Sequence, residues 1–187
     1  MPSGSPTSPN PRFAASCAEA LAHSAAVAAS PDITVAAIVV RDDRFLVVEE
    51  RIKGRDVFNQ PAGHVEAGET LLEAVIRETL EETAWTLRPT ALLGAYRWQA
   101  PKASRPTLRF AFVGDVLQHD PMRPLDRGIL AARWLTRADL QGQADRLRSP
   151  LVLRCIDDFI AGRRHPLEPV GRLDLSNAAQ VAPVSVA

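Results

Sequence analysis

The sequence lacks an excess of either charge, and it has few aromatic residues. Lys and Arg total 22, Asp and Glu also total 22, and Phe, Trp and Tyr make up only 5% of the 187 residues. A protein that binds nucleic acid needs a basic face, and one that binds single strands also needs aromatic rings for the bases. We therefore expect no nucleic-acid partner. A local basic pocket for a small anion is still compatible with zero net charge.

Cysteines and long apolar segments are also scarce. The two cysteines, Cys17 and Cys155, are expected to be free thiols, which fits a reducing cytoplasm. No apolar run approaches the roughly 18 residues of a membrane-spanning helix. The N-terminus has no Lys- or Arg-containing n-region before an apolar run, so we expect no secretory signal. These absences predict a cytoplasmic protein without membrane contact. Whether it is a monomer or a homodimer is left open by the sequence.

The composition changes twice along the chain and predicts three parts. Residues 1–30 are dominated by Ala, Ser and Pro, and we expect a disordered or weakly helical N-terminal extension. Residues 31–168 carry regular apolar patterns and are expected to form the folded domain. Residues 169–187 have little pattern and are expected to form a C-terminal tail.

Apolar periodicity predicts the fold class of the domain. Segments rich in β-branched residues indicate strands, and the two that flank "RDD" indicate a hairpin. A helical pattern runs from Thr70 to about Thr83, and two more helices are indicated near the end of the domain. The expected strands are 33–40, 44–50, 56–61, 90–100, 107–117 and 130–136. This order predicts an α/β (α+β) fold with a mixed sheet between helices.

The first of these helices carries an unusual number of carboxylates. With Glu78 at zero and about 100° per residue, Glu82 lies at about 40° and Glu81 at about −60°. We expect the apolar residues of the helix on the opposite side. Like charges at these spacings repel one another. A bound divalent cation would offset the repulsion, whereas a solvated acidic face would need none, and helix geometry alone leaves both open.

The loop before the helix favours the cation. The segment "NQPAGHVEAGET" places Pro61, Gly63 and Gly68 ahead of the helix. Small residues allow backbone carbonyls and amides to approach a ligand closely. Mg²⁺ commonly binds one or two carboxylates together with substrate phosphates. We therefore predict a metal–phosphate site where this loop meets the helix.

The same segment resembles the Nudix box, written G-x5-E-x7-R-E-U-x-E-E-x-G-U with U a bulky apolar residue. Its matching positions are Gly63, Glu69, Arg77, Glu78, Glu81 and Glu82. From about Ile33 to Glu168, flanking words such as "FLVVEE" and "LRSPLV" are similar to the phosphatase NudJ group of Nudix hydrolases. The resemblance implies a Nudix-type α/β/α sandwich and Mg²⁺-dependent hydrolysis of a diphosphate linked to another group, with Mn²⁺ as an alternative metal.

The resemblance also implies roles for individual residues. Glu78, Glu81 and Glu82 are expected to hold the metal and to carry the catalysis, with the backbone carbonyl of Ala62 as a further ligand. Glu78 and Glu82 are expected to be the main ligands, and Glu81 a further ligand or the general base. Arg77 and the first glutamate of the box are expected to brace the loop against the helix.

Three positions depart from the family pattern. Ala84 stands where the box has Gly, so we expect either mild backbone strain or a longer helix. Thr79 replaces a bulky apolar residue, but its methyl group can pack and its hydroxyl can bond the preceding turn. Many Nudix enzymes have an acidic residue six positions before the tryptophan that matches Trp134. Here that position is Gly128, with Asp126 as a candidate replacement, so the general base is left open.

Four residues outside the helix are candidate substrate contacts. Arg109 alternates with apolar neighbours, so it either clamps phosphate or lies on a solvated strand face. Gln60 either contacts substrate or ends its strand as a polar group. His64 either contacts phosphate or bonds to backbone, and Trp98 either stacks on a substrate ring or packs.

These expectations lead to one function and two alternatives. The resemblance implies a hydrolase of nucleoside di- and triphosphates, of the hydroxymethylpyrimidine diphosphate of thiamine synthesis, and of other small diphosphates. The alternatives are an ADP-ribose or nucleoside-diphosphate-sugar pyrophosphatase, and a noncatalytic Nudix-like module that binds nucleotide. Orthophosphate released from GDP distinguishes the first function, and AMP released from ADP-ribose the second.

Overall fold

The computed structural model describes residues 30–101 and 103–168. The predicted extension up to residue 29, the predicted tail from residue 169, and Cys17 lie outside the described residues. The elements are β1 (Asp32–Ile38), β2 (Val40–Arg41), β3 (Arg44–Ile52), β4 (Arg55–Asn59), β5 (Ala62–His64), α2 (Leu71–Thr83), β6 (Trp85–Trp98), β7 (Thr107–His119), β8 (Ile129–Thr136), α3 (Arg137–Gly142), the 3₁₀ turn η1 (Ala144–Arg146) and α4 (Leu151–Ile160). None of the described helices is long and apolar enough to cross a bilayer.

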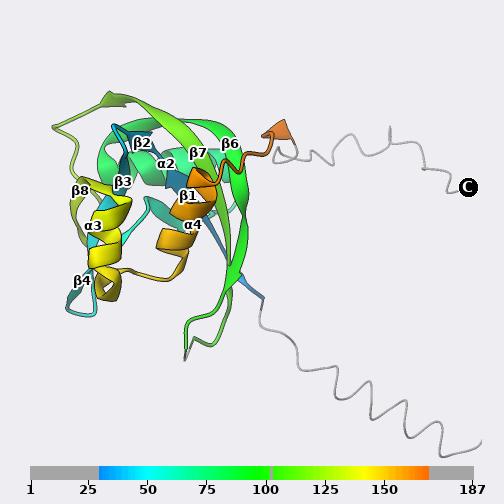
Figure 1. Ribbon diagram of the computed structural model, residues 1–187. Helices are drawn as coiled ribbons and strands as arrows, with labels where there is room; N and C mark the ends of the chain where they lie inside the picture. Colours follow the sequence, from blue (N-terminus) through cyan, green and yellow to red (C-terminus); the bar gives the residue numbers. More distant parts are fainter. Residues whose placement is uncertain (1–29, 102, 169–187) are drawn as a thin grey trace, which may run out of the picture. The chain divides into compact units, whose positions relative to one another are not determined.

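The strands form two sheets (Figure 1). The first has the order β5-β1-β7-β6 and is mixed, because β1 runs parallel to β7 and antiparallel to β5. The second is antiparallel and joins β3 to β2, β4 and β8. The mixed sheet and the β2–β3 hairpin are confirmed, and Asp42 and Asp43 form its turn with φ of 48° and 57°. The single strand expected at 33–40 is instead interrupted at Val39, where the chain passes from one sheet to the other.

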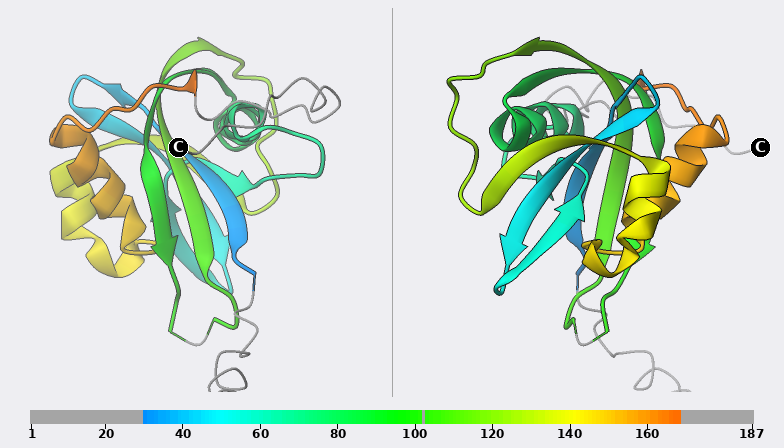
Figure 2. Two further views of the ribbon diagram at one scale, coloured as in Figure 1. Left: turned by 90° about the vertical axis from the view of Figure 1, so that its right-hand side faces the viewer. Right: turned by 60° about the vertical axis from the view of Figure 1, so that its left-hand side comes forward.

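Both faces of the sheets are buried, and each is covered by helix (Figure 2). Successive residues of a strand point to opposite faces, so Ala37 and Ile38 of β1 belong to different apolar clusters. Helix α2 covers the cluster that contains Ala37 and Phe112. Helices α3 and α4 cover the other cluster through Leu140 and Ile156. The predicted α/β/α sandwich is confirmed.

Helix α2 begins where the sequence predicts but packs differently. Thr70 caps it, and the Thr70 hydroxyl and the Glu73 carboxylate each accept a hydrogen bond from the other's backbone N–H. The buried residues of α2 are Ala74, Val75, Thr79, Glu82 and Thr83, whereas the leucines and Ile76 are only half-buried. The predicted separation of a core face from a carboxylate face is therefore wrong for Glu82. Small residues bring α2 close to β5, β1 and β6, so the buried arc includes this carboxylate.

The end of α2 keeps the backbone conformation of the family pattern despite its alanine. Ala84 adopts φ 58° and ψ 15°, and its N–H donates to the carbonyl of Leu80 at 2.9 Å. A left-handed alanine costs about 1 kcal/mol, so mild strain rather than a longer helix is the outcome. Thr79 is buried, and its hydroxyl donates to the carbonyl of Val75 at 2.7 Å as expected.

Candidate active site

Arg77 ties the loop before α2 to the acidic side chains of the helix. Its Nη2 donates to Glu69 at 2.7 Å and to the carbonyl of His64 at 3.0 Å. Its Nη1 donates to Glu78 at 2.9 Å and to Glu81 at 3.0 Å. These bonds, chiefly the one to Glu69, raise the pKa of Arg77 and lower that of Glu69. One guanidinium therefore braces the loop and offsets repulsion among the glutamates.

Glu82 is a buried carboxylate at the contact between α2 and β5. Its Oε2 accepts a hydrogen bond from the N–H of Ala62 at 2.8 Å. Burial raises the pKa of Glu82 to about 8, and the nearby charges of Glu78, Glu50 and Asp126 add to this rise. Burial also raises the pKa of Glu78. Negative charge at this contact is therefore costly without a cation.

Gly63 explains the first residue of the box. A Cβ at this position would overlap the side-chain carboxylate of Glu78. Only glycine lets the Glu78 carboxylate lie directly against the backbone of β5. The strand thus forms a cradle for a carboxylate of α2.

The residues around this contact fit a hard divalent cation by chemistry. Carboxylate oxygens are the ligands that Mg²⁺ and similar ions prefer. Within the two described ranges, no group of three or more His, Cys, Asp or Glu side chains is already arranged to hold a metal ion. Glu78 and Glu81 are engaged by Arg77, and Glu82 by the N–H of Ala62. A cation would have to compete with these partners for the carboxylates.

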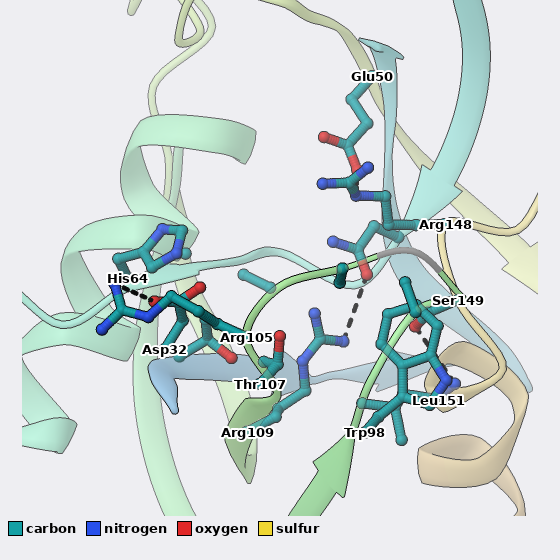
Figure 3. Close-up of a pocket in the computed structure, with 16 residues that line it drawn as sticks. Asp32, Glu50, His64, Trp98, Arg105, Thr107, Arg109, Arg148, Ser149 and Leu151 are labelled. Carbon is teal, nitrogen blue, oxygen red and sulfur yellow. Dashed lines mark hydrogen bonds and ion pairs between the residues drawn. The ribbon is translucent and has the colours of Figure 1, made fainter. Parts of the chain in front are cut away.

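A cavity of about 540 Å³ adjoins the acidic contact (Figure 3). Ala62 and Gly63 of β5 lie in its wall, so the cavity and the carboxylates of α2 share this strand. The rest of the wall comes from β1, β3, β4, β7, the end of β6 with the loop that follows it, and the segment that leads into α4. Its polar and aromatic residues include Asp32, Glu50, Asn59, His64, Trp98, Arg105, Arg109, Arg148 and Ser149.

Arg109 is a buried cation in this wall. The side chain extends from β7, and the residue is only 7% exposed, which excludes the solvated strand face. Its Nη1 donates to Asn59 Oδ1 and to Gln60 Oε1, both at the long distance of 3.4 Å. Its Nε is buried without a hydrogen-bond partner. Burial lowers the pKa of Arg109, since no ion pair compensates for the lost water.

The other three predicted substrate contacts lie at different depths. Gln60 is 1% exposed, and its Nε2 donates to the carbonyl of Val152 in α4 at 2.8 Å. Its Oε1 accepts from Arg109, so Gln60 links α4 to Arg109 beneath the surface of the cavity. His64 is exposed at one end of the cavity (Figure 3). Trp98 is half-buried and lines the opposite part of the wall near Leu151.

Glu50 and Arg148 belong to the cavity but were not predicted from the sequence. Glu50 Oε1 is buried without a hydrogen bond, and Arg148 Nε lies 3.7 Å from it. Burial raises the pKa of Glu50, although Arg148 opposes this. The neighbouring Glu49 instead pairs with Arg133 and Arg146. Strand alternation predicts different surroundings for the two adjacent glutamates, but the register of β3 against β8 shifts between them, which the sequence does not reveal.

Asp126 also lies near the acidic contact. Its N–H donates to the carbonyl of Glu81 at 3.0 Å, and its charge raises the pKa of both Glu78 and Glu82. Gly128 takes a φ of 98° in the turn before β8. Position 128 therefore has no carboxylate, but the carboxylate of Asp126 is close enough to act electrostatically on Glu78 and Glu82.

This helix, its cradle in β5 and the adjoining cavity define a hydrolase of the Nudix class. The NUDIX domain model matches residues 31–154, and the chain belongs to this family. The chain is 44% identical over 141 residues to Phosphatase NudJ of Escherichia coli (strain K12). This match covers 75% of this chain and 91% of that protein. Phosphatase NudJ of Shigella flexneri matches equally.

Solved structures agree with this assignment. A NUDIX hydrolase from Nitrosomonas europaea has a TM-score of 0.75 and 41% identity, and covers 77% of this chain and 98% of that one. A UDP-X diphosphatase has a TM-score of 0.60 with 20% identity, covering 82% of this chain and 73% of its own, and supports the fold alone. The chain is therefore an enzyme that hydrolyses small molecules bearing pyrophosphate linkages, and the noncatalytic alternative is set aside.

Proposed function

We propose that this enzyme is a Mg²⁺-dependent phosphohydrolase that releases orthophosphate from small diphosphates and triphosphates. The observation that carries the proposal is the contact of Glu78 and Glu82 of α2 with a strand that also walls a cavity containing a buried arginine, with Glu81 joined to Glu78 through Arg77. Carboxylates provide ligands for the metal, and Arg109 provides a cation for phosphate. Both cations are needed because the glutamates of α2 and the phosphates of the substrate are all negatively charged and would otherwise repel one another.

The residues would divide the work between binding and proton transfer. A bound Mg²⁺, held by Glu78, Glu81, Glu82 and the Ala62 backbone, would neutralise phosphate charge and lower the pKa of bound water. Glu81 is the proposed ligand or proton acceptor, because it is the more exposed member of the triplet, with 29% of its side chain accessible against 12% for Glu78. Mn²⁺ has the same ligand preference and should substitute.

The cavity residues would bind the rest of the substrate. Arg109 would hold phosphate with Gln60 behind it, and His64 would reach phosphate from the exposed end. Trp98 offers a flat face for a heterocyclic ring. We propose nucleoside di- and triphosphates and hydroxymethylpyrimidine diphosphate as substrates, because the relatives with 44% identity are named Phosphatase NudJ. We further propose a cytoplasmic monomer or homodimer whose catalytic domain spans residues 31–168.

A phosphate-release panel tests the proposal. GDP, GTP, hydroxymethylpyrimidine diphosphate, geranyl diphosphate and ADP-ribose are each incubated with the full chain and Mg²⁺, with Mn²⁺, or with EDTA. We expect metal-dependent orthophosphate from the compounds that end in a free phosphate. Release of AMP from ADP-ribose as the dominant reaction would replace this proposal with the sugar-nucleotide pyrophosphatase.

A further inference from the structure

We propose that Arg109, Arg148 and Ser149, together with the N-terminus of α4, form a subsite for a terminal phosphate dianion, and that this subsite selects substrates with a free terminal phosphate. The inference rests on the proposed function for its catalytic meaning, but the subsite itself can be tested by binding alone. The subsite adds to the proposed role of Arg109 as a general phosphate contact, because it specifies that the terminal phosphate of the substrate lies beside Arg109 and Arg148.

Arg109 is the centre of the subsite. It is more than nine-tenths buried and lines the cavity, yet its Nε has no partner and its Nη1 has only two long bonds to amide oxygens. A buried guanidinium is normally paired with a carboxylate or another anion. An anion that enters the cavity would supply the missing acceptors.

The residues that lead into α4 bring further donors to the same place (Figure 3). The backbone N–H of Arg148 donates to the carbonyl of Phe58 at 2.8 Å, which fixes the entry to the helix beside β4. Ser149 Oγ accepts from the N–H of Leu151 at 3.3 Å, so its own hydroxyl can still donate. This ten-residue helix also places the positive end of its dipole at the cavity wall.

The charges distinguish this end of the cavity from the acidic contact at β5. Glu50 lies 3.7 Å from Arg148, so the two arginines retain one net positive charge even when Glu50 is ionised. The donors comprise two guanidinium groups and one hydroxyl, which exceed the two unesterified oxygens of an internal phosphate. A terminal phosphate has three such oxygens and two charges. The subsite therefore matches a terminal phosphate, which has one substituted oxygen, better than an internal phosphate, which has two.

Orthophosphate binding to the full-length, metal-free protein tests the subsite directly. Calorimetric titration with inorganic phosphate in EDTA should show one saturable site. Arg109→Met should weaken it about 10- to 100-fold, and half-exposed Arg148→Gln about three- to tenfold. Arg105→Gln is the matched control, because it removes the same charge from the other end of the cavity, where Arg105 pairs with Asp32. Its affinity should stay within about twofold of the native value.

Turnover measurements then show whether the subsite binds the terminal phosphate of a substrate or only free orthophosphate. Arg148→Gln should reduce kcat/KM for GDP more than for ADP-ribose, which has no terminal phosphate. If Arg109→Met does not fold, Arg148→Gln and Ser149→Ala decide. Unsaturable binding, or equal losses in Arg148→Gln and Arg105→Gln, would overturn the subsite while leaving the hydrolase intact. Saturable, Arg148-dependent binding without turnover on the panel would instead support the subsite and refute the proposed hydrolysis.

Discussion

Replacing Glu82 by Gln tests whether α2 buries a charge that needs a cation. Glu82 is 9% exposed, and burial raises its pKa from 4.5 to about 8. Between these two pH values the folded protein keeps the proton and the unfolded chain has lost it. The contribution of Glu82 to the free energy of unfolding without metal therefore falls as pH rises from about 4.5 to about 8.

The pKa difference sets the upper size of this effect. Each pKa unit corresponds to about 1.4 kcal/mol, so a rise from 4.5 to about 8 costs at most about 4–5 kcal/mol at pH 8.5. Glutamine has no charge to lose, and its carbonyl can still accept from the N–H of Ala62. Glu82→Gln should therefore be more stable than the native protein at pH 8.5, by at most about 4–5 kcal/mol, and within about 1 kcal/mol of it at pH 5.

Urea unfolding in EDTA at pH 5 and pH 8.5 measures the effect. Glu66→Gln is the control, because it removes an exposed carboxylate from the loop before the same helix. Added Mg²⁺ at pH 8.5 should stabilise the native protein more than Glu82→Gln, and the variant should lose at least about 100-fold in turnover. A variant that is destabilised equally at both pH values, or that retains metal-dependent turnover, would refute the reasoning.

Substitutions at three other positions probe α2 and its contact with β5. Arg77→Met should lower the unfolding free energy in EDTA by about 2 kcal/mol at low salt, because it leaves Glu78 and its neighbours unpaired, and an unchanged urea midpoint would contradict the bracing role. Gly63→Ala should fold but bind Mg²⁺ at least about tenfold more weakly, since its Cβ displaces Glu78; native affinity by calorimetry would argue against the cradle. Ala84→Gly should stay within about 1 kcal/mol of the native stability, whereas Ala84→Val should lose about 2 kcal/mol or more in thermal unfolding, and equal effects would exclude backbone strain.

The elements with local signals could be predicted from the sequence. Thr70 and Glu73 mark the start of α2 because a capping box needs only neighbouring residues. The "RDD" turn marks the hairpin because positive φ is a local property. The division into two sheets could not be predicted in the same way. The strand around Val39 is apolar throughout, and only its pairing with distant strands shows where it changes sheet.

The candidate site was predictable only in its helical part. The spacing of the box identifies Glu78, Glu81 and Glu82, but an ideal helix gives no information about which side packs. Glu82 is buried because small residues of α2 lie against β5. Glu50 and Arg148 meet across a separation of 98 residues because the segment between η1 and α4 bonds to Phe58 of β4, and no local pattern records that contact.

The most direct measurement of the central claim is orthophosphate release from GDP by the full chain, with ADP-ribose as the competing substrate. With Mg²⁺ we predict orthophosphate and GMP from GDP, no turnover in EDTA, and a lower kcat/KM for ADP-ribose. Turnover of GDP that persists in EDTA, or AMP from ADP-ribose as the faster reaction, would contradict it.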